Sequence, residues 1–443
     1  MPFLRRTVFT KTTRDIAVLT AVALVARLWW IWSSAWMAGD TGQYLKIARN
    51  LAFHHAFSLT EGATGQLIPT AHRPPLYPAL IALFWWADSP PIMAVLMLQS
   101  LLGAATVALV YLIASDGFNR TVALIAGLAM AFAPMTGYFT AVVLTETLFT
   151  FLLTLAIFLW GREKRVLAGL AFGLAALTRP GLLFFLFALP WLALIPSLRR
   201  FWRTYLTISL VALALSSVWI IRNAVVFGKF IPVAASGWGM NLLCGTIETE
   251  LVGIKVWTGT EWALLDLKNH PLLQVERGLT ETERDRVLWQ RAIERIKEKP
   301  IHWLFVRAGQ YPKLFLDSGN YALGRHNIPI GQALAESRFW VLLVKVSFLA
   351  INILSLGIAI LGIISERKRI HLLIHMIAFP LFLLLVQLPM WTESRYSLPI
   401  MPMVAIFFAV GWQRITRKTR FAVGGPDSQK ASPSHESIEA ATS

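Results

Sequence analysis

Residues 16–36 read IAVLTAVALVARLWWIWSSAW, a run of 21 residues in which apolar side chains dominate. At a rise of about 1.5 Å per residue, a helix of this length spans the roughly 30 Å hydrocarbon core of a bilayer. The run is too long for the apolar region of a cleavable signal peptide and lacks a small-residue cleavage pattern. It therefore predicts a first transmembrane helix that stays in the protein as a signal anchor.

The whole chain has the composition of a membrane protein. Of its 443 residues, 56% are hydrophobic and 15% are charged, whereas a soluble domain has about 25% charged residues. The net charge of +17 comes from short basic clusters between apolar runs, a pattern typical of cytoplasmic loops and not of a nucleic-acid-binding face. The single cysteine, Cys244, excludes an internal disulfide and a multi-cysteine metal site.

Ten apolar runs are candidate spans, which predicts an all-α polytopic membrane protein. They cover residues 16–36, 92–114, 122–138, 146–160, 166–177, 182–196, 205–221, 339–364, 370–390 and 397–412. With these ten spans every basic cluster falls on one side, which the positive-inside rule identifies as the cytoplasm, together with both termini. Residues 76–87 are also apolar, but a helix of that length reaches only about 18 Å. We therefore expect an interfacial or re-entrant helix on the outer face.

This topology divides the chain into four regions. We predict an N-terminal transmembrane module (1–226) with a first outer segment (37–91), a large extracytoplasmic loop (227–338), C-terminal transmembrane helices (339–423) and a disordered cytoplasmic tail (424–443). In the large loop, Thr280 and Glu283 have the spacing of a capping box. The apolar residues that follow recur at helical spacing up to Pro300. They predict an amphipathic helix on the outer membrane surface or on the transmembrane bundle.

Ionisable residues gather at the outer ends of the predicted spans and in the first outer segment. An ionisable side chain at membrane depth costs several kcal/mol unless it is paired, so each one is a functional candidate. Their origin in separate parts of the chain is what an active site at the outer membrane interface needs. The candidates are Asp40, Arg73, Glu146, Arg179, Arg222, Glu393 and Arg395.

The two leading carboxylates each have a structural and a catalytic interpretation. Asp40 can be the N-cap of a helix that runs to Ala52, with Gln43 as its capping-box partner. Alternatively, it is a general base that deprotonates an acceptor hydroxyl while a phosphate leaves. Asp40, Gln43 and Tyr44 share one face of this helix. Glu146 is either a first-turn carboxylate favoured by the helix dipole or a member of the catalytic site.

The arginines are candidate phosphate ligands, because a guanidinium matches phosphate oxygens bidentately. Arg73 precedes a Pro-Pro turn and can instead extend its side chain to the membrane interface. Arg179 lies at a helix break, where an arginine at membrane depth needs an anionic partner. Arg222 and Arg395 can be lipid anchors, and Arg395 can also pair with Glu393.

Common cofactor signatures are missing from the sequence. It has no Walker A loop, GxGxxG, HExxH or Cys/His metal spacing, and no DxD pair that would indicate a divalent metal. We therefore assign no metal ligand and no cofactor, and an ATP-driven pump is not expected.

Several motifs together resemble those of the GT-C membrane glycosyltransferases, in the branch of protein O-mannosyltransferases and lipid A aminoarabinose transferases called glycosyltransferase family 39. They run in order from residue 39 to residue 399, and each lies at an outer helix end of the predicted topology. The motifs are Gly39-Asp40-Thr41-Gly42-Gln43-Tyr44, Arg73-Pro74-Pro75-Leu76-Tyr77-Pro78, Thr145-Glu146-Thr147, Thr178-Arg179-Pro180, Ile221-Arg222-Asn223 and Glu393-Ser394-Arg395-Tyr396.

The resemblance implies a GT-C-type bundle and an enzyme that transfers a sugar, with inversion, from a polyprenyl-phosphate donor. The acceptor would be a hydroxyl or phosphate of a glycolipid, glycan or protein at the outer face of a bacterial cytoplasmic membrane. Asp40 matches the catalytic base of the family and Glu146 its second acidic position, although many relatives have Asp-Glu where this chain has Asp40-Thr41. Donor and phosphate binding would fall to Tyr44, Arg73, Arg179, Arg222 and Arg395.

Two other functions fit the sequence less closely. A transporter or flippase of lipid-linked sugars needs ionisable residues near the bilayer midplane and discontinuous helices in two repeated halves. Here the charges lie at one face and no repeat is visible. A non-enzymatic assembly partner would bind the lipid phosphate without turnover.

Overall fold

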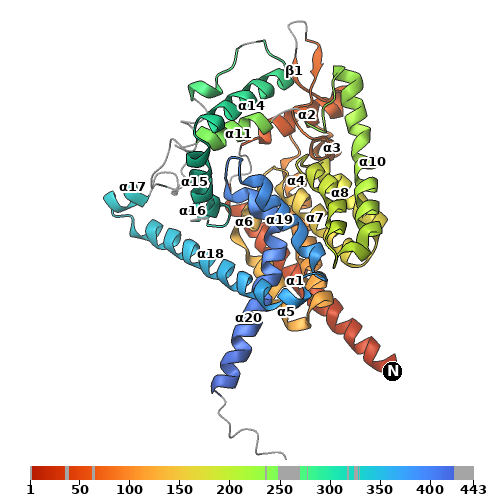
Figure 1. Cartoon of the computed structure of the whole chain (residues 1–443), viewed down its shortest axis with the longest axis vertical. Coiled ribbons are helices and arrows are strands. Elements are labelled where there is room, and N and C mark those ends of the chain that lie inside the picture. Colours follow the sequence, from red (N-terminus) through yellow and green to blue (C-terminus); the bar gives the residue numbers. More distant parts are fainter. Residues whose placement is uncertain are drawn as a thin grey trace, which may run out of the picture.

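The protein is a bundle of helices with one small hairpin at one end (Figure 1). The computed structural model describes residues 2–34, 39–61, 65–234, 237–247, 270–276, 278–316, 319–323, 328 and 330–423. The predicted tail, 424–443, lies outside these residues. The N-terminus and the end of α20 lie at the same end of the molecule, opposite the hairpin.

Five helices are long and apolar enough to cross a membrane. They are Lys11–Ser33, Ile92–Gly117, Arg199–Phe227, Phe339–Ser365 and Ser394–Arg417. They correspond to α1 (Pro2–Ser33), α4 (Ile92–Gly117), α10 (Trp202–Phe227), α18 (Phe339–Ser365) and α20 (Met401–Val423). The spans of α10 and α20 also include the short 3-10 helices that precede them, η2 (Arg199–Phe201) and η7 (Ser394–Ile400). Each coincides with a predicted span, so the prediction of a polytopic all-α membrane protein is confirmed.

One predicted span, 122–138, is broken rather than continuous. Its two parts, α5 (Arg120–Phe132) and α6 (Pro134–Thr140), meet at an angle of 54°. Pro134 is the cause, because proline has no N–H to donate and its ring clashes with the preceding turn. Ala133 between the helices has an extended backbone (φ −62°, ψ 112°), which suits the residue before a proline.

The four remaining predicted spans are apolar helices shorter than those five. They are α7 (Glu146–Gly161), α8 (Arg165–Ala176), α9 (Leu182–Ala188) with its 3-10 extension to Leu194, and α19 (Ile374–Gln387). Among the described residues, the structure therefore supports five clear spans, or six if the bent pair is one span.

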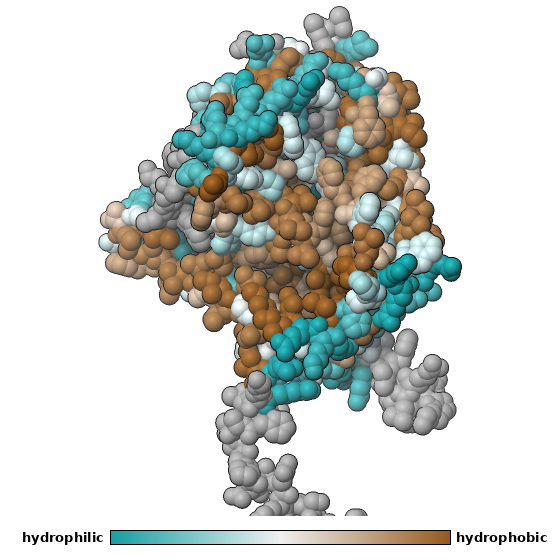
Figure 2. Space-filling view, in the orientation of Figure 1, coloured by the Kyte–Doolittle hydropathy of each residue, from teal (hydrophilic) through white to brown (hydrophobic). Residues whose placement is uncertain are grey.

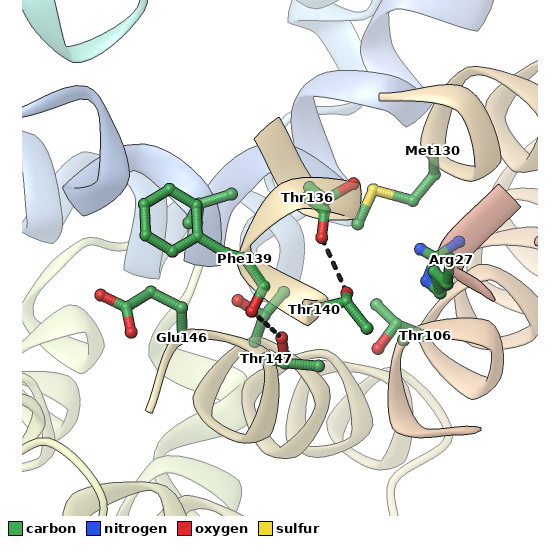
Figure 3. Close-up of a pocket in the computed structure, with 11 residues that line it drawn as sticks. Arg27, Thr106, Met130, Thr136, Phe139, Thr140, Glu146 and Thr147 are labelled. Carbon is green, nitrogen blue, oxygen red and sulfur yellow. Dashed lines mark hydrogen bonds between the residues drawn. The ribbon is translucent and has the colours of Figure 1, made fainter. Parts of the chain in front are cut away.

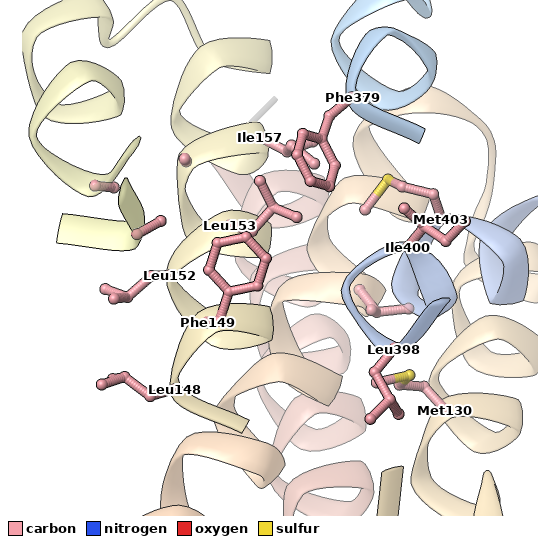
Figure 4. Close-up of a cluster of buried hydrophobic side chains, with 14 of the residues drawn as sticks. Met130, Leu148, Phe149, Leu152, Leu153, Ile157, Phe379, Leu398, Ile400 and Met403 are labelled. Atoms are coloured by element: carbon pink, nitrogen blue, oxygen red, sulfur yellow. The ribbon is translucent and has the colours of Figure 1, made fainter. Parts of the chain in front are cut away.

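The bundle core surrounds α4 and α7. Figure 4 shows Phe149, Leu153 and Ile157 of α7 packed towards Phe379 of α19 and Met403 of α20. Nearly the whole of α7 is buried. A helix that is apolar all round belongs in such an interior position.

The predicted first outer segment consists of short elements. Helix α2 (Thr41–His54) leads to the antiparallel strands β1 (Ser58–Glu61) and β2 (Leu67–Pro69), and then to α3 (Leu76–Ala82). The predicted helix at 76–87 is therefore shorter than expected. Tyr77 and Ile81 of α3 are buried in the bundle core.

The large outer loop adds a helical layer over the same end of the bundle. It contains α11 (Trp238–Ile247), α14 (Glu281–Glu298) and α15 (Pro300–Gln310), followed by the short α16 (Asn320–Leu323) and α17 (Ile330–Ala335). The predicted capping box of Thr280 and Glu283 is present at the start of α14. Leu288 and Ala292 of α14 pack on Leu243 and Trp391, so this amphipathic helix covers protein rather than lipid.

The surface shows a broad apolar band between two polar rims (Figure 2). One rim includes α14, and the opposite rim lies near the N-terminal side of the bundle. This distribution is that of a protein whose apolar belt faces lipid. The protein is therefore an integral membrane protein.

Candidate active site

The first candidate carboxylate lies at the start of α2. Gly39 has a positive φ of 53°, and the chain turns there so that the Asp40 carbonyl accepts the N–H groups of Gln43 and Tyr44. The Asp40 side chain makes no capping hydrogen bond. Its carboxylate instead lies 2.5 Å from Nη2 of Arg73. Asp40 is therefore at the predicted N-cap position, but its side chain does not cap the helix, and the capping box with Gln43 is absent because the Gln43 side chain bonds to Arg73.

Arg73 joins α2 to the loop before α3. Its Nε donates to Oε1 of Gln43 at 2.6 Å, and its guanidinium lies 5.4 Å from the ring centroid of Tyr44. Thr41 fixes the same end of α2 from the other side, because its hydroxyl donates to the Val143 carbonyl at 3.0 Å. The predicted alternative, in which Arg73 extends freely to the interface, does not hold.

The second carboxylate starts α7, a few residues after Val143. One oxygen of Glu146 lies 2.7 Å from Nη2 of Arg179, whose Nε donates to the Thr145 hydroxyl at 3.3 Å. Glu146 is only 3% exposed, and its Oε2 has no hydrogen-bond partner among the described residues. Arg179 thus has the anionic partner that its position at a helix break requires.

Tyr44 is buried beside the first of these ion pairs. Its ring packs edge-on against Tyr77 at a centroid distance of 5.2 Å, and the side chain is buried. Burial raises the pKa of the Tyr44 hydroxyl, Asp40 and Glu146 raise it further, and Arg73 and Arg179 oppose the shift. The hydrogen bond from Thr41 to Val143 joins the residue after Asp40 to the segment just before Glu146, so the two pairs lie in neighbouring parts of one site.

A third pair comes from the segment before α20. Arg395 and Glu393 are 2.5 Å apart, and Glu393 also accepts the indole N–H of Trp391 at 2.8 Å. A Cβ placed on Gly39 would lie 3.8 Å from Nη1 of Arg395. Arg395 is therefore beside the turn that carries Asp40, and the predicted pairing with Glu393 is confirmed.

Arg222 lies at the edge of the site and is not a member of the three ion pairs described above. Its Nη1 donates to the Thr70 carbonyl at 3.1 Å and to Asn223 Oδ1 at 3.0 Å. Its guanidinium also lies over the rings of Phe57, Trp219 and Phe227. Within the described part of the chain it forms no ion pair with a carboxylate, although the Glu281 carboxylate, which bonds to the same Thr70, acts on it electrostatically.

Sequence reasoning missed one contributor, Glu281 on α14. Its carboxylate accepts the Thr70 hydroxyl at 2.5 Å and the Ala71 N–H at 3.0 Å, two residues before Arg73. The capping-box pattern predicts the helix start next to Glu281 but cannot reveal a contact with a loop 210 residues earlier. His72 in this loop has a pKa lowered by burial and by Arg73, while Glu281 and Asp40 oppose the shift.

The site has no cluster typical of a metal centre. Among the described residues, no group of three or more histidine, cysteine, aspartate or glutamate side chains is close enough to hold an ion. The groups present can pair with an anion, accept a proton at Asp40 and donate hydrogen bonds from guanidinium groups. That set fits the transfer of a group from a phosphate.

Residues 72–221 match the dolichyl-phosphate-mannose-protein mannosyltransferase family. This segment includes Arg73, Glu146 and Arg179, and ends one residue before Arg222. No curated protein matches the chain.

Comparison with solved structures gives membrane glycosyltransferases. The Archaeoglobus fulgidus oligosaccharyltransferase in complex with zinc and sulfate has a TM-score of 0.54 at 15% identity, over 92% of this chain and 50% of that one. The same organism's oligosaccharyltransferase AglB, in complex with an inhibitory peptide and a dolichol-phosphate, has a TM-score of 0.52 at 13% identity, over 96% and 52%. ArnT from Cupriavidus metallidurans bound to undecaprenyl phosphate has a TM-score of 0.41 at 18% identity, over 94% and 81%.

This protein spans about half the length of the Archaeoglobus enzymes, and at these identities the likeness concerns the fold. The family match covers the segment that carries three of the site residues. The resemblance indicated by the sequence motifs is therefore confirmed: the chain has the fold of the GT-C membrane glycosyltransferases, and its residues 72–221 match their protein mannosyltransferase branch.

Proposed function

We propose that the protein is a glycosyltransferase that takes a sugar from a polyprenyl-phosphate-linked donor at the outer face of the membrane. The observation that carries the proposal is the Asp40–Arg73 ion pair beside the Glu146–Arg179 pair. This arrangement puts a carboxylate that can accept a proton next to guanidinium groups that can bind a phosphate. The fold neighbour that binds a dolichol-phosphate supports a lipid-linked donor.

The arginines of the site suit this donor. A sugar joined to a polyprenyl phosphate is a phosphodiester with one negative charge, and the guanidinium groups of Arg73 and Arg395 lie beside Asp40, where they can pair with it. On leaving, the polyprenyl phosphate gains a second negative charge. Preorganised arginines stabilise charge that develops in this way. Arg73 and Arg395, which flank Asp40, are placed to take up that charge.

The proposed reaction is a single displacement. Asp40 accepts the proton of the acceptor hydroxyl while its oxygen attacks C1 of the sugar, and the bond from C1 to the phosphate oxygen breaks. One displacement at C1 inverts its configuration. The donor phosphate competes for Arg73, which releases the Asp40 carboxylate from its ion pair. The unpartnered Oε2 of Glu146 is available to accept a hydroxyl of the sugar.

Asp40 begins α2, which lies at the end of the bundle opposite the N-terminus (Figure 1). At the opposite end, Arg162 pairs with Asp116 and Arg369 donates to the Gly117 carbonyl, both at the end of α4. Helix α1 begins and α20 ends on that side (Figure 1). We propose that this face is cytoplasmic and that transfer occurs on the other one. A bacterial cytoplasmic membrane satisfies this arrangement.

The test is mass spectrometry of envelope glycolipids and glycoproteins from a deletion strain. Complementation uses the wild-type gene, Asp40→Asn and Asp116→Asn. Asp116 pairs with Arg162 at 2.8 Å at the opposite end of the bundle and serves as a matched control. We expect one sugar to be missing in the deletion strain, restored by the wild type and Asp116→Asn, and absent with Asp40→Asn. Unchanged envelope glycans in the deletion strain would overturn the proposal.

Transport of lipid-linked sugars is the alternative that the broken α5–α6 span favours, since discontinuous helices are common in transporters. In the described part of the chain this is the one bent pair, whereas transporters commonly pair such helices across two halves. Movement of a lipid-linked sugar across vesicles by the purified protein, without any glycosyl transfer, would support transport instead.

A further inference from the structure

The space between Glu146 and Arg27 is too small for a sugar ring. It is a cavity of about 20 Å³, which has room for about one water molecule (Figure 3). Figure 3 shows the Glu146 carboxylate pointing away from Arg27, and this carboxylate pairs with Arg179. A sugar that reacts near Glu146 therefore has to lie on the side of that ion pair, where the loop that carries Arg73 also lies.

Arg73 belongs to a loop whose backbone is restricted on both sides of it. Before Arg73, the N–H of His72 donates to the Thr70 hydroxyl at 3.0 Å. After it come two prolines, whose rings restrict φ, and the first of them, Pro74, also disfavours a helical backbone at Arg73. The position of the Arg73 guanidinium therefore depends on what holds Thr70.

Glu281 of α14 holds Thr70 and the residue after it. One carboxylate oxygen accepts the Thr70 hydroxyl at 2.5 Å, and the other accepts the Ala71 N–H at 3.0 Å. Thr70 and Ala71 are each 1% exposed, so without the carboxylate both donors would lose a hydrogen bond in the protein interior. Two hydrogen bonds from adjacent residues to one carboxylate fix both the place and the rotation of this backbone.

Helix α14 is a rigid support for Glu281 because it crosses α11 closely. A Cβ on Gly239 of α11 would lie 2.1 Å from the Asp285 carbonyl oxygen, so the two backbones touch at this point. The Asp285 side chain accepts the N–H groups of Gly237 and Gly239 at 3.0 and 3.1 Å. Contact between two backbones leaves little freedom for α14 to shift.

The same pair of helices also reaches Arg395. The backbone N–H of Trp391 donates to the Asn241 carbonyl of α11 at 2.9 Å. The indole N–H of Trp391 donates to Glu393, the ion-pair partner of Arg395. Helices α11 and α14 are therefore connected to both arginines that flank the proposed base.

We infer that Glu281 is a positioning residue that acts through Thr70 and Ala71 to hold Arg73 where it meets the donor phosphate. This inference rests on the proposed function and adds to the site a residue from the large outer loop. A guanidinium binds two phosphate oxygens only when it is aligned with them, so a small displacement of the loop weakens the contact. The negative charge of Glu281 would itself repel a phosphate. Positioning and charge therefore predict opposite effects of its removal.

The test is equilibrium binding of a short-chain polyprenyl phosphate to the purified full-length protein in phosphatidylcholine nanodiscs. Glu281→Gln should bind this lipid about tenfold more weakly, the scale of one charged hydrogen bond, although it removes a repulsive charge. Thr70→Val breaks the same contact without a change of charge and should weaken binding to a similar extent. Thr70→Ser keeps the hydroxyl and should bind like the wild type. Glu294→Gln, at an exposed position of the same helix, is the matched control and should also bind like the wild type.

A double-mutant cycle with Arg73→Gln separates positioning from a general loss of structure. If Glu281 acts through Arg73, the double variant Arg73→Gln/Glu281→Gln binds no more weakly than Arg73→Gln alone. Thermal unfolding verifies that each variant is folded at the temperature of the assay. Binding by Glu281→Gln that equals or exceeds that of the wild type, or losses that add in the double variant, overturns this inference alone. If the wild type does not bind the lipid, the proposed function fails as well.

Discussion

At the scale of single residues, the site contains three carboxylates, and each forms an ion pair with an arginine. Two of these arginines come from a distant part of the chain, and one is two residues away. Arg73 holds Asp40, Arg179 holds Glu146, and Arg395 holds Glu393. The pairs differ in burial, because Asp40 is 36% exposed and Glu146 is 3% exposed. Loss of one partner therefore has different consequences at the two carboxylates.

Glu146→Gln should lower the free energy of unfolding by about 3 kcal/mol, because it leaves the Arg179 guanidinium without its buried partner. Adding Arg179→Gln should recover at least part of this loss. Thermal unfolding in detergent measures both effects in a double-mutant cycle. Glu163→Gln is the control, since its pair with Arg165 is exposed and long at 3.8 Å, and we expect no measurable change. Strictly additive losses for Glu146 and Arg179 would contradict the coupling.

The stability of the protein should fall on acidification because of His72. Its pKa is lowered by burial and by Arg73, so the folded protein keeps this imidazole neutral at pH values where the unfolded chain protonates it. The contribution is fully present above the ordinary histidine value of 6.5 and is lost as the pH falls through the lowered pKa. Thermal unfolding between neutral and acidic pH should show a smaller decrease for His72→Gln. Identical pH profiles would refute this assignment.

The sequence predicts the members of the site better than their contacts. Asp40, Arg73, Glu146 and Arg179 are identifiable because ionisable residues at span ends are costly and few. Which arginine meets which carboxylate depends on the rotation of each helix and the path of each loop, and spacing does not encode either.

At the scale of helices, local signals predict most elements. The capping box at Thr280 and the apolar periodicity after it locate α14 within a residue or two. The position of a proline is a weaker signal for where a helix ends. Pro134 breaks the helix, although it lies within a run that is apolar enough to be one span. Whether a proline kinks or interrupts a membrane helix depends on the neighbours that satisfy the freed backbone groups.

The contact between α18 and α20 depends on two glycines. A Cβ on Gly362 would lie 2.0 Å from the Phe407 carbonyl oxygen, and one on Gly411 would lie 2.0 Å from the Ile358 carbonyl oxygen. Gly362→Ala should therefore separate the helices and reduce stability by about 1–3 kcal/mol. Gly357→Ala on the same helix meets no atom within 4 Å and should be neutral or slightly stabilising. Equal melting temperatures of the two variants in detergent would refute this close crossing.

At the scale of the whole molecule, the polar rims and the apolar band indicate how the protein sits in a membrane (Figure 2). The span prediction and the structure agree on an all-α membrane protein with the fold of GT-C glycosyltransferases. The sequence alone could not predict how the large outer loop covers the site, because Glu281 meets Thr70 and Ala71 only through tertiary folding.

The orientation can be measured with cysteines introduced at two exposed positions. In a Cys244→Ser background, Asp88→Cys lies in the first outer segment and Arg367→Cys in a predicted cytoplasmic loop. An impermeant maleimide should label Asp88→Cys in intact spheroplasts and Arg367→Cys only after permeabilisation. The reverse labelling pattern would place the candidate active site in the cytoplasm.

The central claim, that Asp40 is the base of a polyprenyl-phosphate sugar transferase, is tested most directly by turnover of the purified enzyme in proteoliposomes. Release of polyprenyl phosphate is followed with lipid-linked sugars and acceptors extracted from the native membrane. Asp40→Asn should reduce turnover by about 10²-fold or more without weakening donor binding, because the donor phosphate then no longer competes with the Asp40 carboxylate for Arg73. Asp116→Asn should retain wild-type turnover. Turnover of Asp40→Asn within a few-fold of the wild type would contradict the account.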